Sequence, residues 1–430
     1  MPTLEEPSST RTQASSTGSE AIRPLPLSEI FAASQRLNGA IAETPCSESI
    51  ALSEITGTTL FCKREYLHRT GSFKERGARN ALALLSKEQA AKGVVAASAG
   101  NHALGLAYHG RALGVPVTVV MPRFAPLVKV ATCRRLGANV ILHGNTFDEA
   151  RTAADQLARE KGLTYLHPFD DRNVIAGQGT LALEVLDQVP DLDAILVPIG
   201  GGGLIAGVAS VLRTLKPGVE IIGVEPENAA CFKAGLAAGH PVGITPRYTL
   251  ADGLAVAKVG AQTLGLASEL VDRVVTVRED AIALAILRLA ELEKAVVEGA
   301  GATALAALLS GAVPELAGKR VVIPLTGGNI DPLAHSRVIE RGLAADGRIY
   351  RFNALIGDRP GSLAHLSAAL AAAGANVTEI VHNRTFAGPD LSSVHVLCTV
   401  ETRDREHIEE INRHLTREGV CLDTTSCEPS

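Results

Sequence analysis

The feature that most constrains the fold is a repeated alternation of short apolar runs with amphipathic stretches, which begins at Gly93. The apolar runs are rich in Val and Ile and lack interleaved polar residues, as strands covered on both faces of a sheet require. Each run leads into a stretch with helical spacing, so strands feed helices repeatedly. The sequence therefore predicts an α/β fold with parallel strands up to residue 345, and the runs are "VVAAS", "VTVVMP", "NVILHG", "AILVPIGGGG", "EIIGVEP" and "RVVIPLTGG".

The C-terminal part follows a different order. Residues 348–427 are predicted to form strand, helix, two strands, helix and strand, the βαββαβ order of a ferredoxin-like domain. "DRPG" predicts the turn into the first helix, with Gly361 or Ser362 near its cap, and Gly374 stands where a glycine ends a helix. We therefore expect a second, smaller domain.

Charge and hydropathy narrow the choice of partners. The formal net charge is −5, from 41 Lys and Arg against 46 Asp and Glu, which gives no basic field for nucleic acid or anionic membranes. No apolar run reaches the roughly 18 residues that span a bilayer, and the N-terminus lacks a secretory pattern. We expect a cytoplasmic protein with a small-molecule partner, no nucleic acid and no membrane.

Two further features concern order and redox state. Residues 1–25 are rich in Ser and Thr and have few large apolar residues, so a disordered N-terminal segment is expected. The seven cysteines form no C-x-x-C pair, which indicates neither a disulfide framework nor a zinc site. We expect buried thiols.

The strongest candidate site is "PIGGGGLIAG", residues 198–207, where four glycines stand between a Val/Ile strand and an amphipathic helix. Glycines let backbone N–H groups wrap an anion, and the dipole of the following helix attracts negative charge. No Gly-Lys-Ser/Thr follows, so this is not a P-loop. The pattern predicts a phosphate site, with a flexible turn as the alternative.

Two further loops follow predicted strands. In "ASAGNHALG", residues 97–105, Ser98 and Asn101 stand among free N–H groups at a helix start, which is suited to a carboxylate, although an ordinary helix cap is an equal alternative. In "PLTGGNID", residues 324–331, Thr326 ends a strand and is placed to hydrogen-bond a ring nitrogen. Taken alone, the second loop is better explained as a simple β-turn.

The fourth segment is "TGSFKERGARN", residues 70–80. Ser72 and Glu75 have the spacing of a capping box, so a helix is expected to begin here with Lys74 in its first turn. A cation is disfavoured there by about 0.3 to 1 kcal/mol. Alone, Lys74 is best explained as a surface lysine. Together with a phosphate cradle, a carboxylate cradle and a ring-nitrogen partner, it predicts pyridoxal 5′-phosphate bound as a Schiff base.

These motifs carry a family resemblance. "GSFKERGA", "SAGNHALGLAYH", "PIGGGGL", "VVEGAGA" and "LTGGNID", in this order, resemble the threonine ammonia-lyases (threonine dehydratases), which are fold-type-II pyridoxal phosphate enzymes. The resemblance covers residues 35–345 and implies a catalytic domain over residues 26–345, built from two parallel-sheet α/β subdomains like those of tryptophan synthase β. "DRPGSLAHLSAAL" and "GANVTEI" give residues 348–427 the likeness of an ACT domain, a regulatory module of amino-acid metabolism.

The resemblance implies roles for individual residues. Lys74 holds the cofactor and then removes the Cα proton of the substrate, while Phe73 packs beside it. Asn101 bonds the 3-hydroxyl of the cofactor, and Thr326 faces the pyridine nitrogen. The 5′-phosphate is bound by Gly200, Gly201, Gly202, Gly203 and Leu204, and the substrate carboxylate by Ser98, Ala99, Gly100, Asn101 and His102.

The implied reaction is the β-elimination of water from L-threonine, which gives 2-oxobutanoate and ammonia, with L-serine giving pyruvate. A hydroxyl at the pyridine nitrogen leaves the ring unprotonated and favours elimination over racemisation. Serine racemases carry a second Ser where this chain has Ala99, so racemisation is expected to be minor. The family setting is amino-acid metabolism, including isoleucine biosynthesis.

Three positions depart from the family pattern. Relatives usually have Ser or Cys at the position of Thr326. Many have Gln at the position of Leu104, and the loss of this polar side chain makes the substrate preference less certain. In metal-binding relatives an Asp stands where this chain has Cys231, although Glu225 and Ala229 match. Because a thiol is a poor ligand for hard cations, no metal is expected.

Several alternatives stay open at this point. An ACT domain implies an amino-acid effector near Gly361 and Asn376, with a purely oligomerising tail as the alternative, and a homodimer or homotetramer is expected. A dehydratase of threo-3-hydroxyaspartate or serine is the rival enzyme. It needs a cationic side chain to pair with the second carboxylate of the substrate, for which Arg123 and Arg247 are candidates. A non-catalytic amino-acid sensor is the remaining hypothesis, and the retained Lys74 argues against it.

Overall fold

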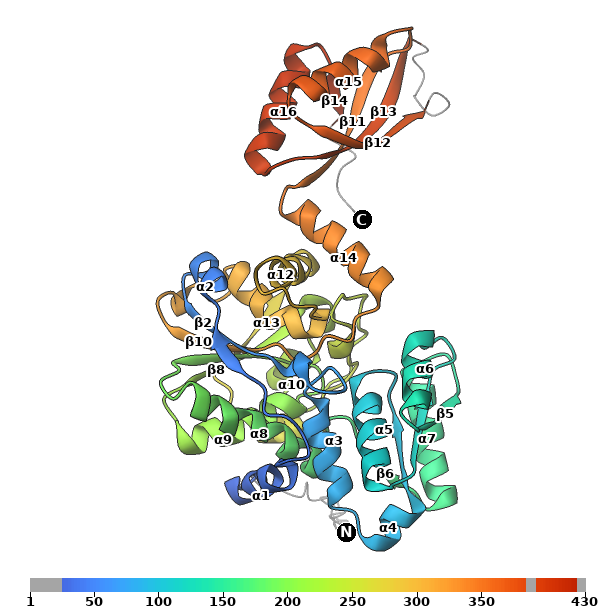
Figure 1. The fold of residues 1–430 in the computed structure, drawn as a ribbon, viewed down its shortest axis with the longest axis vertical. Coiled ribbons are helices and arrows are strands. Elements are labelled where there is room, and N and C mark those ends of the chain that lie inside the picture. The colour runs from blue at the N-terminus through green and yellow to red at the C-terminus, as the bar shows by residue number, and fades with distance from the viewer. Residues whose placement is uncertain (1–24, 384–391, 424–430) are drawn as a thin grey trace, which may run out of the picture.

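A computed structural model describes residues 25–383 and 392–423 (Figure 1). The predicted disordered segment lies outside these residues except for Leu25, which is buried in the core. The described chain forms a body with two largely parallel sheets, and an antiparallel unit joined to it through α14 (Pro332–Ala345) stands at the top of Figure 1.

The larger sheet has six strands and forms the core of the body. Five strands are parallel, and the edge strand β1 is antiparallel to β2. All five residues of the central strand β7 are buried, which confirms the expectation drawn from its continuous apolar run. In sheet order the strands are β1 (Cys46–Glu48), β2 (Thr59–Lys63), β10 (Arg320–Pro324), β7 (Ala194–Pro198), β8 (Glu220–Pro226) and β9 (Arg273–Val277).

Helices cover both faces of this sheet. Ile195 and Leu196, neighbours on β7, enter two different core clusters, because successive side chains of a strand point to opposite faces. The α-helices are α1 (Leu27–Leu37), α2 (Ile50–Thr56), α8 (Arg172–Gln188), α9 (Gly203–Leu215), α10 (Cys231–Ala238), α11 (Ala261–Ala267), α12 (Glu279–Leu292) and α13 (Gly299–Leu309). Short 3₁₀ helices are η1 (Glu65–Leu67), η2 (Glu227–Ala229), η3 (Asp252–Leu254) and η4 (Pro314–Leu316).

The smaller sheet has four parallel strands and defines the second subdomain. Its inner strand β3 is fully buried, whereas the edge strand β5 is partly exposed, so the expectation of two covered faces is wrong for "NVILHG". In sheet order the strands are β5 (Asn139–Leu142), β4 (Val117–Met121), β3 (Val94–Ala97) and β6 (Thr164–Tyr165). The helices are α3 (Lys74–Ala83), α4 (Lys87–Lys92), α5 (Asn101–Leu113), α6 (Leu127–Arg135) and α7 (Phe147–Lys161).

Helix α3 joins the two subdomains, because it packs closely on α8 from the large one and on α5 from the small one. The contact with α8 depends on glycine. A Cβ atom at Gly177 would lie 2.6 Å from the carbonyl oxygen of Arg76 and 2.7 Å from Cα of Gly77. The helix that begins at Lys74 is therefore held between the two units.

The C-terminal unit has the predicted βαββαβ order, in a four-stranded antiparallel sheet ordered β12-β13-β11-β14. Helix α15 begins after Gly361, and Gly374 has φ +78° just beyond its end, as expected for a glycine that ends a helix. The elements are β11 (Ile349–Gly357), α15 (Ser362–Ala372), β12 (Asn376–Asn383), β13 (Ser393–Glu401), α16 (Arg405–Arg417) and β14 (Cys421–Asp423).

Two exclusions drawn from the sequence can be compared with the structure. Within the described ranges, no helix combines the length and apolar character needed to cross a membrane. The described cysteines are all free thiols, and they are buried as expected except for Cys421, which is exposed, while Cys427 lies outside the described residues.

Candidate active site

The lysine segment lies directly against the loop that follows β10. Ser72 pairs with Gly327 in an antiparallel bridge, and the N–H of Phe73 donates to the carbonyl of Thr326 at 3.0 Å. The N–H of Gly328 donates to the carbonyl of Gly71, also at 3.0 Å. The structure thus brings two of the four predicted segments together, although they are far apart in the sequence.

Helix α3 begins at Lys74, but the predicted capping box is wrong. The hydroxyl of Ser72 is buried and has no hydrogen-bond partner among the described residues. The carboxylate of Glu75 accepts from the N–H of Thr70 and lies 3.1 Å from Nε2 of His109 on α5. Glu75 therefore ties the lysine segment to the small subdomain, a role that sequence spacing cannot distinguish from capping.

The Lys74 amine is partly buried at the end of the loop after β6. Its Nζ donates to the carbonyl of Pro168 at 2.8 Å and lies 5.0 Å from the ring centroid of Phe73. Burial lowers the pKa of Lys74 to about 8, and the nearby Glu298 opposes this shift. At neutral pH the amine therefore has a larger neutral fraction than a surface lysine.

The four glycines form a nest of unpaired N–H groups. The carbonyls of Gly200, Gly201 and Gly202 accept from Cys231, Thr263 and Ala206, whereas no described residue accepts from the N–H groups of residues 200–204. Gly202 has φ +90°, and a Cβ atom at Gly201 would lie 2.2 Å from the ring of Phe169. The side chain of Leu204 packs in the core, so only its backbone is available to a ligand.

The start of α5 offers a second group of donors. Ser98 Oγ accepts from the N–H of Gly100 at 3.3 Å, and no described residue accepts from the N–H groups of residues 99 and 101–103. The side chain of Ala99 is only a methyl group, so its backbone N–H is its one donor here. His102 is buried against the carbonyl of Leu166 at 3.2 Å, and burial lowers the pKa of its imidazole to about 3.

Asn101, at the first position of α5, makes two side-chain hydrogen bonds. Its Nδ2 donates to Glu298 at 2.6 Å, and its Oδ1 accepts from Asn329 at 2.9 Å. Burial raises the pKa of Glu298 to about 7, with Asp252 adding to the shift. The sequence analysis missed both partners, although Glu298 stands in "VVEGAGA" and Asn329 in "LTGGNID", two of the motifs that carried the resemblance.

His167 is a further site residue that the sequence analysis missed. It precedes Pro168, the acceptor of the Lys74 amine, and its Nδ1 accepts from the N–H groups of Phe169 and Asp170 at 3.3 and 2.8 Å. Burial lowers the pKa of this imidazole to about 3, helped by the charges of Arg151 and Lys74. His167 thus holds the turn that touches both Lys74 and the glycine loop, and no motif pointed to it.

These features match the chemistry of pyridoxal phosphate. The nest of free N–H groups suits a phosphate dianion, and the Lys74 amine suits a carbonyl group that forms a Schiff base. Thr326 is buried at the end of β10, and the structure gives its hydroxyl no hydrogen bond to another described residue, so it is available to a ring nitrogen. The residues present therefore fit this cofactor.

The position that binds a cation in some relatives has a different arrangement here. The two carboxylate oxygens of Glu225 accept from the N–H groups of Phe232 and Lys233, at 2.7 and 2.9 Å, and the Cys231 thiol faces Gly200. No group of three potential ligands lies close together in the described part of the chain. The N–H groups at the start of α10 thus already bind the Glu225 carboxylate. The absence of a metal stays a prediction.

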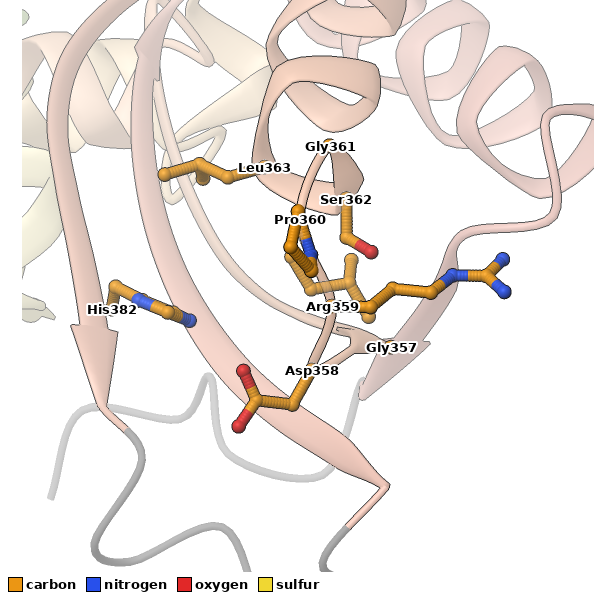
Figure 2. Close-up of a pocket in the computed structure, with 9 residues that line it drawn as sticks. Gly357, Asp358, Arg359, Pro360, Gly361, Ser362, Leu363 and His382 are labelled. Carbon is orange, nitrogen blue, oxygen red and sulfur yellow. The ribbon is translucent and has the colours of Figure 1, made fainter.

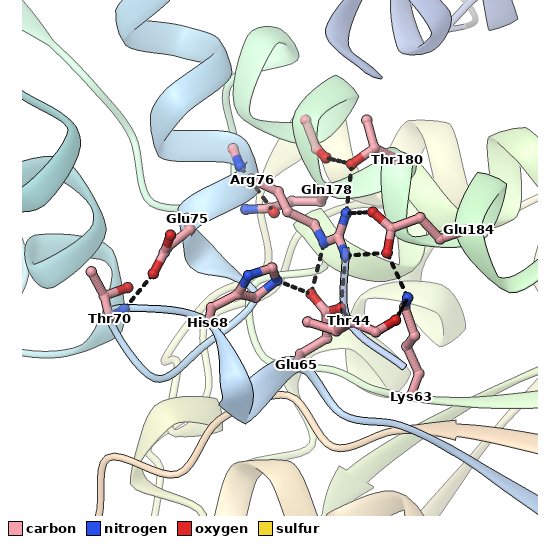
Figure 3. Close-up of polar contacts among 12 residues, drawn as sticks. Thr44, Lys63, Glu65, His68, Thr70, Glu75, Arg76, Gln178, Thr180 and Glu184 are labelled. Carbon is pink, nitrogen blue, oxygen red and sulfur yellow. Dashed lines mark hydrogen bonds and ion pairs between the residues drawn. The ribbon is translucent and has the colours of Figure 1, made fainter. Parts of the chain in front are cut away.

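Behind the lysine helix lies a buried ionic cluster, shown in Figure 3. Arg76 on α3 donates to Glu65 at 2.7 and 2.8 Å and to Glu184 on α8 at 2.5 and 2.7 Å. Lys63 also donates to Glu184, at 2.5 Å. Arg76, Glu65 and Lys63 are fully buried, so this cluster fixes α3 to the large subdomain.

Three other predicted positions lie apart from these contacts. The apolar side chain of Leu104 is buried in the core of the small subdomain. Arg123 and Arg247 are exposed, and within the described residues only their backbone N–H groups make hydrogen bonds. The structure therefore gives neither arginine a contact with the Lys74 site.

The C-terminal unit contains a separate pocket of about 350 Å³ at the start of α15 (Figure 2). Gly361 lines it, together with Arg359, Leu363 and His382. Asn376 does not line it, because it stands at the other end of β12 and donates to Glu401 at 2.7 Å. Within one chain, His382 is the residue of β12 that lines this pocket, and an effector near Gly361 and Asn376 stays a prediction.

The fold and the site define a class of enzyme. Residues 37–327 match the family profile described as "Pyridoxal-phosphate dependent enzyme", and the chain belongs to this family. Its cofactor is therefore pyridoxal phosphate, and the two parallel-sheet subdomains are those of a fold-type-II enzyme.

Within that family, the chain is similar to proteins with one recurrent name. It is 44% identical to the L-threonine ammonia-lyase of Thermotoga maritima over 91% of this chain and 98% of that protein. It is 47% identical to the protein of the same name from Geobacter sulfurreducens, over 93% of this chain and 99% of that one. Among solved structures, the processed threonine deaminase isoform 2 of Solanum lycopersicum matches with a TM-score of 0.69 at 39% identity, over 75% of this chain and 96% of that chain.

Proposed function

We propose that this enzyme deaminates L-threonine to 2-oxobutanoate and ammonia, and also converts L-serine to pyruvate. The observation that carries the proposal is the partly buried Lys74 amine, which donates to Pro168 next to Phe169, the residue whose ring packs against the glycine loop. Relatives aligned over nearly their full length bear the name L-threonine ammonia-lyase, which supports the same substrate.

Lys74 is the base for the Cα proton. With a pKa of about 8, its amine is neutral in roughly a tenth of molecules at pH 7, against fewer than about one in a thousand for an unperturbed lysine. When bound, the cofactor would accept the electron pair that remains on Cα after this proton is removed. Pro168 and Phe73 contact the amine and limit the orientations that it can take.

The start of α5 binds the substrate carboxylate. The N–H groups of Ala99, Asn101 and His102 have no acceptor among the described residues, and the helix dipole favours an anion there. Because burial keeps His102 neutral, the carboxylate is held by N–H groups and not by an ion pair. This arrangement suits any α-amino acid, so the side chain of the substrate must be selected elsewhere.

Two residues favour elimination over racemisation. The Thr326 hydroxyl gives the ring nitrogen a neutral partner, which weakens the electron sink and leaves little time for reprotonation. Ala99 offers no proton donor opposite Lys74. Loss of the β-hydroxyl is therefore the expected outcome.

The competing functions receive less support. A threo-3-hydroxyaspartate dehydratase needs a cation for the second carboxylate, and the described contacts bring neither Arg123 nor Arg247 to Lys74. A non-catalytic sensor has no use for a lysine with a lowered pKa. Both alternatives remain outcomes of the assay below.

We also infer an amino-acid effector at the pocket beside Gly361. Its lining combines backbone N–H groups at the start of α15 with Arg359 and His382, which suits a small zwitterion. An ion-pair cluster connects this unit to the catalytic body, because Arg348 pairs with Glu291 on α12 and Asp346 pairs with Arg288 at 2.5 Å. A homo-oligomer in the cytoplasm remains the expectation for the assembly.

The test is a 2-oxo acid assay with L-threonine, L-serine and threo-3-hydroxyaspartate, each with and without isoleucine, valine or AMP. We expect the highest kcat/KM with L-threonine, and loss of activity and of the visible cofactor band in Lys74→Ala. Preference for threo-3-hydroxyaspartate would favour the dehydratase alternative. Protein purified in the presence of pyridoxal phosphate that shows no cofactor band would refute the proposal. Formation of D-amino acid faster than oxo acid would also refute it.

A further inference from the structure

The side-chain amide of Asn101 has an orientation that can be deduced from its neighbours. Asn329 Nδ2 donates to the backbone carbonyl of Thr70 at 2.6 Å, and a carbonyl can only accept, so the Asn329 amide group facing it must be the nitrogen. The same nitrogen lies 2.9 Å from the Asn101 side chain, which must therefore present its oxygen there. The backbone carbonyl of Thr70 thus determines the orientation of both side-chain amides.

The second contact of Asn101 agrees with this orientation. With Oδ1 directed to Asn329, Nδ2 faces Glu298 and donates to its Oε1 at 2.6 Å. Glu298 is itself fixed, since its N–H donates to the carbonyl of Gly327 at 3.0 Å and it stands at the start of α13. An amide nitrogen carries two hydrogens, so one N–H of Asn101 remains after Glu298 has accepted the other.

Close packing limits how far the Asn329 and Glu298 side chains can move. A Cβ atom at Gly71 would lie 2.5 Å from Oδ1 of Asn329, and one at Gly327 would lie 2.3 Å from Oε1 of Glu298. The chain of hydrogen bonds therefore runs from the lysine segment, through Asn329 and Asn101, to Glu298. It joins the lysine segment to the loop after β10, the start of α5 and the start of α13.

We propose that Asn329 and Glu298 are positioning residues that fix the Asn101 amide with its remaining N–H, and not its carbonyl, directed at the 3-oxygen of the cofactor. The inference rests on the proposed function and deepens it. A donor at this oxygen stabilises its anionic form, in which the proton sits on the Schiff-base nitrogen and the cofactor absorbs visible light. A carbonyl there would repel the anion and favour the form that absorbs in the ultraviolet.

The test is Asn329→Asp, which keeps the shape of the side chain but removes both donors. A carboxylate at this position cannot donate to Thr70 or Asn101, so Asn101 turns its nitrogen toward residue 329. We expect the visible band to lose intensity to the ultraviolet band, and the Kd for pyridoxal phosphate to rise about tenfold. Asn139→Asp makes the same change at an exposed site and is expected to leave both quantities unchanged.

The outcomes separate this inference from the proposed function. Wild-type protein that binds no cofactor refutes the proposed function itself. A wild-type band that persists unchanged in Asn329→Asp, with unchanged Kd, overturns only the positioning role. If that variant does not fold, two variants at Glu298 replace it. Glu298→Gln still accepts from Asn101 and is expected to keep the visible band, whereas Glu298→Leu is expected to lose part of it. Visible bands of equal intensity in the two variants would overturn the inference.

Discussion

Replacement of Arg76 by methionine is expected to destabilise the catalytic body strongly and in a pH-dependent way. Arg76 is fully buried and donates five hydrogen bonds: two to Glu65, two to Glu184 and one to Thr180 (Figure 3). After the replacement Glu184 keeps its ion pair with Lys63, whereas the Glu65 carboxylate keeps, among the described residues, only Thr44 and His68 as partners. The buried carboxylate of Glu65 thus loses its strongest partner.

The magnitude follows from the burial. Removing one partner of a buried ion pair costs about 3 to 5 kcal/mol, because the remaining charge is neither solvated nor paired. At about 2 °C per kcal/mol for a body of this size, the midpoint of thermal unfolding should fall by about 6 to 10 °C. The exposed pair between Lys92 and Glu88 offers a control, since Lys92→Met should cost less than about 1 kcal/mol.

The sign of the pH effect distinguishes this mechanism from a packing defect. Burial alone raises the pKa of Glu65, but Arg76 and His68 hold it well below its usual value, so their stabilisation is present above the unfolded pKa and is lost as pH falls. Without Arg76 the carboxyl is protonated more easily, so the variant loses most relative to wild type near pH 8 and least near pH 5. Unfolding followed by circular dichroism at both pH values tests this, and an equal loss at both would refute the reasoning.

Three further predictions concern the site. Gly201→Ala places a methyl group against the Phe169 ring and should weaken cofactor binding at least tenfold, measured by fluorescence titration, whereas Gly218→Ala, in open space, should not. Incorporation of pyridoxal phosphate into apoenzyme should speed up as pH rises toward about 8, the pKa of Lys74, because the neutral amine attacks, and a rate independent of pH would contradict this. Burial raises the pKa of Glu225 to about 7, so the stability that its protonated form contributes is lost as pH rises from about 5 to 7, and the free energy of unfolding of Glu225→Gln should rise relative to that of wild type over this range in denaturant titrations.

The sequence predicted the parts of the site that depend on the local pattern. Val/Ile runs that end in Gly-rich or Ser/Asn-containing loops identified the glycine nest, the start of α5 and Thr326, because strand ends in parallel sheets gather ligand-binding loops. Glu298 and Asn329 were missed for a physical reason. Their role depends on contacts across 197 and 228 residues of sequence, and neither residue has a spacing that indicates a partner.

The segment "KER" at the start of α3 shows why spacing alone misleads. Successive helical residues point about 100° apart, so Lys74, Glu75 and Arg76 face three directions. In a surface helix such a triplet is solvated, and the capping-box interpretation of Glu75 assumed that setting. Here Lys74 reaches Pro168, Glu75 reaches His109 on α5 and Arg76 reaches Glu184 on α8. A helix start held on three sides by polar contacts keeps its lysine at one position relative to both subdomains, as the proposed role of Lys74 as a base requires.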